Sequence, residues 1–284
     1  MKPTLHRLTE PRAFSACERL QEAIAGRSFL PAPILVSIDE IGGLVLGAYD
    51  ADVDPPRLCG ALIDLPRRDA QGPAWHTAFH AVAEDARNHG VGSDLRLQER
   101  TEARAADIGL VTWTIDPLRS LEPHLSFNKL AAIAVGYQRN RYGELSDARN
   151  QGLATDRLLV EWWLDSPRVV SVTDHGDLPH HYHVGLDQME VVTKTRPTDN
   201  GLRRLLRFEM APRSNVILAE IPTNLDGMRR IDPDLARDWR LKTRDLFESL
   251  FRSGYTLTGF VHEAGRSFHL LERADREAVL SRTP

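Results

Sequence analysis

A short segment with two closely spaced glycines, Arg87-Asn-His-Gly90-Val-Gly92, stands between an apolar stretch and a polar one. Residues 75–82 before it are predicted to form a strand, and residues 93–107 after it a helix. Glycines at such a turn let backbone amides approach a ligand, and amides at a helix N-terminus attract phosphate. The segment has neither the Lys-Ser or Lys-Thr of a nucleotide phosphate loop nor the third glycine of a Rossmann turn. It therefore indicates an ordinary strand-to-helix turn or a site for the phosphates of another ligand.

Two histidines on the predicted strand have the chemistry of a proton acceptor. Strict alternation places His76 and His80 on one face, together with Ala78 and Val82. A neutral imidazole accepts a proton near pH 7, so either ring could act as a general base. The alternative is a structural, hydrogen-bonded histidine, and the sequence leaves both interpretations open.

The elements that position these residues are predicted in the order β-α-β-β-β-α-β. Strand patterns occur at 5–8, 43–49, 58–65, 75–82 and 110–115, and later at 133–137, 157–164 and 190–194. After Pro167 the pattern changes, and a β-α-β-β group is predicted from a strand at 216–221, a long helix at 232–251 and a hairpin at 255–271. We therefore expect a mixed α/β (α+β) fold with a mostly antiparallel sheet flanked by helices. The expected domains are 1–165 and 166–284.

Composition limits the classes of function. The 284 residues include 36 basic and 40 acidic side chains, a near balance that argues against a broad nucleic-acid surface. Cys17 and Cys59 are too few for a disulfide framework, which favours a reducing cytoplasm. No apolar run approaches the roughly 20 residues of a membrane span. A cytoplasmic protein with no membrane or nucleic-acid partner is expected.

Arg87, Gly90 and Gly92 match the pyrophosphate loop of the GNAT superfamily of acyl-CoA N-acyltransferases, Arg/Gln-x-x-Gly-x-Gly/Ala. The order of elements from residue 5 to about 164 also resembles that superfamily. Four further segments resemble a bacterial branch of it with a C-terminal extension: Gly109–Leu118, Tyr142-Gly143, Asp156-Arg157 and Asp238-Trp239-Arg240.

This resemblance implies an acyl-CoA, either acetyl-CoA or succinyl-CoA, between the fourth and fifth strands. The pantetheine of the acyl-CoA would bond the backbone of Ala81 and Val82. The pyrophosphate of the acyl-CoA would contact the loop, to which Arg87 belongs, through the residues Asn88, His89, Gly90, Val91, Gly92 and Ser93.

The resemblance also suggests catalytic residues. His76 stands where many members have a glutamate base, and His80 is the other histidine candidate. Aligning Ala131 on the family's helix-ending glycine puts Phe127 where a tyrosine would protonate the departing thiolate. Tyr142 is then the candidate proton donor, with a core or loop role as the alternative.

Two other polar clusters receive structural interpretations. The segment Asp174–His183 holds four histidines and two carboxylates without a zinc spacing, so a polar loop and no metal are expected. The pairs Arg203-Arg204 and Arg229-Arg230 are predicted to be solvated faces, with carboxylate binding as the alternative.

The expected function is transfer of a short acyl group from CoA to the amine of a small molecule, with amino acids as the first acceptor class. Residues 166–284 would shape the acceptor site, and a homodimer is one expected assembly. Two alternatives stay open: a non-catalytic acyl-CoA-binding or interaction module, and a protein-lysine acetyltransferase.

Overall fold

The computed structural model describes residues 3–69, 71–145, 147, 150–178 and 189–283. The chain divides into two compact units, Met1–Trp113 (unit 1) and Thr114–Pro284 (unit 2). Among the described residues, no helix combines the length and the apolar character needed to cross a membrane.

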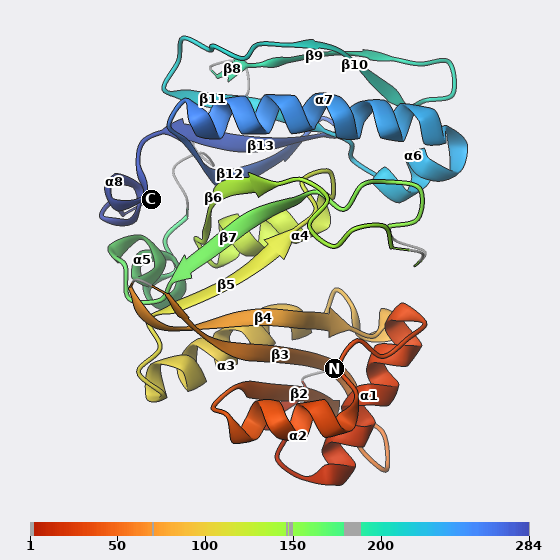
Figure 1. Ribbon diagram of the computed structural model, residues 1–284, viewed down its shortest axis with the longest axis vertical. Coiled ribbons are helices and arrows are strands. Elements are labelled where there is room, and N and C mark those ends of the chain that lie inside the picture. The colour runs from red at the N-terminus through yellow and green to blue at the C-terminus, as the bar shows by residue number, and fades with distance from the viewer. Residues whose placement is uncertain (1–2, 70, 146, 148–149, 179–188, 284) are drawn as a thin grey trace. The chain divides into compact units, whose positions relative to one another are not determined.

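Unit 1 is a sheet with helices on both faces (Figure 1). Its elements are β1 Thr4–Arg7, α1 Pro11–Ala25, α2 Ala32–Glu40, β2 Leu44–Asp50, β3 Arg57–Asp69, β4 Gly72–Val82, the 3₁₀ turn η1 Glu84–Ala86, α3 Val91–Ala105 and β5 Leu110–Ile115, whose last two residues belong to unit 2. The strands lie in the order β1-β2-β3-β4-β5. The pairs up to β4 are antiparallel, and β4 and β5 are parallel.

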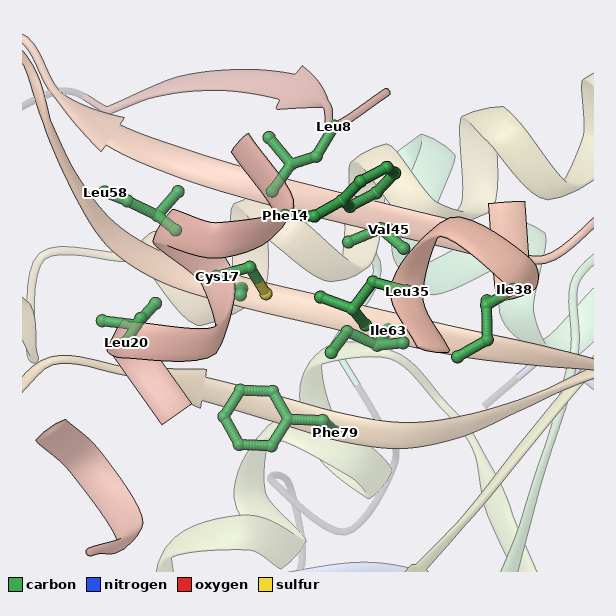
Figure 2. Packing of buried hydrophobic residues seen from close by; sticks show 11 residues of the cluster. Leu8, Phe14, Cys17, Leu20, Leu35, Ile38, Val45, Leu58, Ile63 and Phe79 are labelled. Carbon is green, nitrogen blue, oxygen red and sulfur yellow. The ribbon is translucent and has the colours of Figure 1, made fainter. Parts of the chain in front are cut away.

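The side chains of β3 point alternately to the two faces of the sheet and show which helices cover each face. Ala61 and Ile63 point into a cluster with the apolar side chains of α1 and α2, among them Phe14 and Leu35 (Figure 2). A Cβ on Gly60 would instead lie 3.1 Å from a methyl of Val91 in α3. Because neighbouring strand residues point to opposite faces, α1 and α2 cover one face and α3 covers the other.

Unit 2 contains a second run of strands and a long helix. Its elements are α4 Leu121–Pro123, the π-helical turn η2 His124–Lys129, β6 Ile133–Gln138, β7 Arg157–Trp163, α5 Pro167–His175, β8 Glu190–Val191, β9 Thr193–Pro197, β10 Arg203–Phe208, β11 Val216–Ile221, α6 Leu225–Ile231, α7 Pro233–Arg252, β12 Tyr255–Glu263, β13 Arg266–Arg273 and α8 Arg276–Leu280. The strand order is β7-β6-β12-β13-β11-β8, and β9 pairs with β10 in a separate ribbon.

The expected fold class is confirmed: the protein is mixed α/β with a mostly antiparallel sheet and a β-α-β-β group near the C-terminus. The long helix of that group starts as its sequence indicates. Asp232 accepts a hydrogen bond from the Leu235 amide at 2.9 Å, and Trp239, Leu246 and Leu250 are buried.

The compact units divide the chain at a different place from residue 165. Segment 114–165 belongs to unit 2, where β6 pairs with β12 through Ala134 and Leu257. Strands on both sides of residue 165 therefore share one sheet. The division of function between 1–165 and 166–284 stays a prediction.

Candidate functional site

The glycine turn of unit 1 leaves the N-terminus of α3 open. Gly90 is the N-cap residue with φ 85°, a left-handed conformation that strains any residue with a Cβ. The first helical bond runs from the Asp94 amide to the Gly90 carbonyl at 3.0 Å. In the described part of the chain no side chain caps this helix. The amides of Val91, Gly92 and Ser93 thus have no helical partner and can receive an anion.

The turn is tied to the end of β4. The Arg87 Nε donates to the Val82 carbonyl at 3.2 Å, and the Ala83 amide donates to the Cys59 carbonyl at 2.8 Å. A Cβ on Gly92 would lie 3.5 Å from His80 Nε2 and 3.7 Å from Val82 Cγ2. The first turn of α3 therefore packs directly on the last residues of β4.

A β-bulge interrupts β4 upstream of this turn. Ile63 of β3 pairs with Phe79, but the next residue, Asp64, pairs with Thr77, so Ala78 is the extra residue. A bulge reverses the alternation of side chains across it. Accordingly Thr77 bonds Glu99 of α3, whereas Phe79 lies in the α1/α2 cluster (Figure 2).

The expectation that His76 and His80 share one face is wrong because of this bulge. His80 packs against Gly92 and therefore lies on the α3 face. His76 precedes Thr77, which contacts α3, so its ring lies on the opposite face. Simple alternation fails here because it assumes an uninterrupted pleat.

The surroundings of His80 favour a structural side chain. Its Nε2 is buried and has no hydrogen-bond partner among the described residues. Burial, reinforced by the nearby Arg96 charge, lowers the pKa of His80 to about 3, although contact with the Gly92 backbone acts in the opposite direction. A ring that stays neutral and enclosed in this way is a poor base for a substrate amine.

His76 has a different environment. Its Nδ1 lies 3.0 Å from the Thr112 Oγ1. That hydroxyl donates to the Trp75 carbonyl at 3.2 Å and accepts from Arg67 Nη1 at 3.2 Å. A threonine hydroxyl has one proton and two lone pairs. When that proton goes to the Trp75 carbonyl, the second lone pair accepts from a protonated Nδ1, and the lone pair of the His76 ring is then on Nε2.

The edge of β4 that faces β5 is paired only at its start. Among the described residues, the two strands pair at Trp75 with Val111 and at His76 with Thr112. On its other side β4 stays paired with β3 as far as Val82. Successive strand residues turn their backbone groups to opposite edges. Ala83 donates to Cys59 of β3, so Ala81 also faces β3, while Val82 faces the other edge, where its carbonyl accepts from Arg87 and its amide is open to an extended ligand.

A buried polar cluster joins α3 to the bulge, and sequence reasoning did not find it. Arg96 forms an ion pair with Glu99 at 2.9 Å and donates to Thr77 Oγ1 at 2.8 Å. Asp64 is fully buried beside them, and burial together with the Glu99 charge raises its pKa well above the ordinary value. The only sequence signal is one carboxylate within the apolar run of β3.

The tyrosine candidates lie in unit 2. The Tyr142 hydroxyl is 2.9 Å from Thr114 Oγ1, and its half-exposed ring stands 5.4 Å from the Arg157 guanidinium. Tyr137 donates to Asp156 at 2.7 Å, and burial raises its pKa above the ordinary range. A proton-donor role for Tyr142 stays a prediction.

Phe127 is fully buried within η2, where it lies against the His269 ring. Ala131, the residue aligned with the family's glycine, has φ 54°, a conformation that glycine adopts without strain. The hydroxyl that the resemblance expects at this helix end is therefore missing from position 127.

Segments that carry the branch-level resemblance meet in unit 2. Arg240 binds both carboxylate oxygens of Asp116, at 2.8 and 2.7 Å, and Arg157 lies 3.8 Å from the same carboxylate. Asp156 accepts from Arg244 at 2.8 and 3.0 Å. These contacts give Asp116, Asp156 and Arg240 a structural role as buried ion-pair partners.

In each arginine pair, one side chain is exposed and the other is bonded within the protein. Arg204 and Arg230 are exposed, as predicted. The prediction is wrong for Arg203, which binds the buried Glu220 at 2.9 Å, and for Arg229, which donates to the Gln151 carbonyl at 2.5 Å. Of the histidine-rich segment, residues 179–183 lie outside the described residues. The described residues include no group of histidine, cysteine and carboxylate side chains suited to a metal.

No protein-family model and no curated protein matches the chain. Solved structures similar to it include a GNAT-family acetyltransferase from Streptococcus pneumoniae, at 13% identity and TM-score 0.45 over 56% of this chain and 97% of that one. The ribosomal-protein-S18-alanine N-acetyltransferase from Escherichia coli matches at 13% identity and TM-score 0.44 over 56% and 92%. NAA60 from Arabidopsis thaliana, in complex with a bisubstrate analogue, matches at 13% identity and TM-score 0.46 over 56% and 98%. The likeness spans a little more than half of this chain at low identity.

Proposed function

We propose that this chain transfers an acetyl or other short acyl group, such as succinyl, from acyl-CoA to the amine of a small molecule. Amino acids are the first candidate acceptors. The observation that carries the proposal is the open N-terminus of α3 lying directly on the end of β4, whose β5-facing edge is unpaired beyond His76. A ligand with a pyrophosphate and an extended amide-bearing arm needs these two features side by side.

Acyl-CoA has both parts. Its pyrophosphate would accept hydrogen bonds from amides in the segment Asn88–Ser93. Its pantetheine would bond the backbone of Val82, because the groups of Ala81, the other expected residue, face β3. Arg87 is exposed and adds positive charge beside the loop. Asp94, in the first helical turn, opposes a bound anion, so the amides and Arg87 must outweigh it.

The chemistry requires one proton to leave the acceptor. The amine nitrogen attacks the thioester carbonyl, His76 Nε2 takes the amine proton, and the carbon–nitrogen bond forms as the carbon–sulfur bond breaks. The CoA thiolate then takes a proton from water, since Phe127 has no hydroxyl to give. Thr112, whose Oγ1 lies 3.0 Å from Nδ1, orients the His76 ring.

A test is the release of CoA on a panel of amines, with CoA binding measured in parallel. Turnover with free amino acids supports the proposal. Binding without turnover on any amine identifies a non-catalytic acyl-CoA-binding module. Turnover confined to lysine-containing peptides identifies a protein acetyltransferase.

A further inference from the structure

In unit 2 the short helix α6 leads into α7 (Figure 1). Residues of both helices line a cavity at this junction. Its volume is about 450 Å³, and three arginines, Arg229, Arg230 and Arg237, line it together with Asp226 and the backbone around Gly152. This volume falls in the range of small-molecule sites and far exceeds what one inorganic ion fills.

The lining contains three arginines and one carboxylate. That carboxylate, Asp226, accepts two hydrogen bonds from Arg119, at 2.7 and 3.0 Å. Arg229 also forms an ion pair with Asp226, at 3.5 Å. Arg237 pairs with Asp234, but both side chains are more than half exposed, so water screens their attraction. The cavity therefore has an excess of positive charge.

Two of the guanidinium groups are held in place by neutral acceptors. Arg229 donates to the Gln151 carbonyl at 2.5 Å, and Arg237 donates to the Gly152 carbonyl at 3.3 Å. A carbonyl fixes the direction of a guanidinium without cancelling its charge, so these groups are positioned before a ligand arrives. Arg230 is exposed and has no hydrogen bond or ion pair among the described residues.

The N-terminus of α7 contributes little to the positive charge of the cavity. Asp232 caps the helix through the Leu235 amide, so its own carboxylate already occupies that end. The attraction comes from the arginines, whose planar forks match the two oxygens of a carboxylate or phosphate.

We propose that this cavity binds a small molecule through a phosphate or carboxylate group, with Arg230 as the residue that closes on the anion. The site is built entirely from unit 2 and does not depend on the proposed acyl transfer.

The experiment uses the full chain in low-salt buffer without phosphate, and titrates it with inorganic pyrophosphate and with succinate in separate calorimetric runs. The Gly90→Val background removes anion binding at the α3 turn. Arg230→Ala is compared with Arg204→Ala, which removes one exposed arginine of unit 2 elsewhere. A charge-assisted hydrogen bond is worth about 1.5–3 kcal/mol, so Arg230→Ala should weaken binding roughly 10-fold to 150-fold.

Pyrophosphate binding with no succinate binding assigns a phosphate ligand, and the reverse assigns a carboxylate ligand. Arg204→Ala should retain affinity within about two-fold. The proposal is overturned if neither probe binds, if binding disappears in the Gly90→Val background, or if both arginine variants lose affinity equally. CoA binding by Arg230→Ala, which should match that of the parent, reports on the α3 turn separately.

Discussion

His76 differs from the other histidine on its strand because of one hydroxyl. Thr112 Oγ1 lies 3.0 Å from His76 Nδ1 and 3.2 Å from both the Trp75 carbonyl and Arg67 Nη1. When its proton goes to the Trp75 carbonyl, the hydroxyl accepts from Nδ1. The remaining ring nitrogen then has the lone pair that a base requires. His80, four residues later, is half-buried, and its Nε2 packs against the first turn of α3.

If His76 is the base, His76→Ala should lower kcat by about 10² to 10⁴ and leave CoA affinity nearly unchanged. His80→Ala is the matched control, and we expect it to lower the melting temperature while kcat per folded molecule is retained. Steady-state kinetics with calorimetric CoA titration measures both. Full activity of His76→Ala together with inactive, folded His80→Ala would reverse the assignment.

Thr112→Val tests the positioning role separately. It should reduce kcat by less than His76→Ala and shift the pH profile of kcat, because the tautomer is no longer fixed by a hydroxyl acceptor. If Thr112→Val loses stability but keeps the pH profile of kcat, Thr112 contributes to packing and does not position His76.

Gly90 carries the third prediction at this scale. Gly90→Val places a β-branched residue at φ 85°, next to the amides that would hold pyrophosphate, so CoA affinity should fall at least 10-fold. Gly26→Val introduces similar strain at φ 75° with no atom within 4 Å of the added Cβ, and it should leave CoA affinity unchanged. Calorimetry on both folded variants is the measurement. Equal affinities would remove the turn from the CoA site.

At the scale of elements, the pattern of apolar residues predicted most strands and both helices of the order β-α-β-β-β-α-β. It missed α2, which begins after Pro31 and contains Pro33, and β10, whose sequence Arg-Arg-Leu-Leu-Arg-Phe does not alternate polar and apolar residues. It also missed the bulge at Ala78. A bulge adds one residue to one strand, and Thr-Ala-Phe contains no glycine or proline to indicate it. The two histidines were therefore expected on one face of β4, whereas the bulge puts them on opposite faces.

The Asp64 cluster gives a prediction about pH. The pKa of Asp64 is raised in the folded state, so the folded protein holds a proton that the unfolded chain releases near pH 4. This group's contribution to stability is complete at low pH and is lost as the pH rises through the folded-state pKa. Asp64→Asn has the same size and has no proton to lose.

The free energy of unfolding of Asp64→Asn, relative to the parent, should therefore rise with pH, by up to about 1.4 kcal/mol per pH unit within that window. Urea unfolding at pH 5, 6, 7 and 8 measures it, and Asp52→Asn in an exposed turn is the control. Parallel pH curves for the parent and Asp64→Asn would mean that the carboxyl is ionised in the folded protein.

At the scale of the whole molecule, sequence segments far apart in the chain turn out to stabilise one unit. Arg240 of α7 is 2% exposed and binds Asp116, 124 residues earlier. Burial alone would raise the pKa of Asp116, but Arg240 and Arg157 hold it below the ordinary value. No pattern within either segment reveals this pairing, because ion pairs between distant segments leave no periodic signal.

Asp116→Asn should destabilise unit 2 by about 3–5 kcal/mol, because it leaves the Arg240 charge buried without its partner. Chemical denaturation measures the loss. Asp238→Asn, which breaks the half-exposed pair with Lys242 on the same helix, should cost less than about 1 kcal/mol. Similar losses in the two variants would mean that breaking the buried Asp116–Arg240 pair costs no more stability than breaking the half-exposed Asp238–Lys242 pair.

The last prediction concerns the boundary at residue 165. A chain ending at Leu164 would keep every residue of the α1/α2 cluster of unit 1, but unit 2 would lose β12, which pairs with β6, and α7, which supplies Trp239 and Arg240. The apolar residues left in segment 114–164 would then have no core to enter. Hydrogen exchange on the truncated chain should show protected amides in β2, β3 and β4 and unprotected amides in β6 and β7. Protection of β6 and β7 at full-length values would establish 1–165 as a self-sufficient domain and make the 113/114 division secondary.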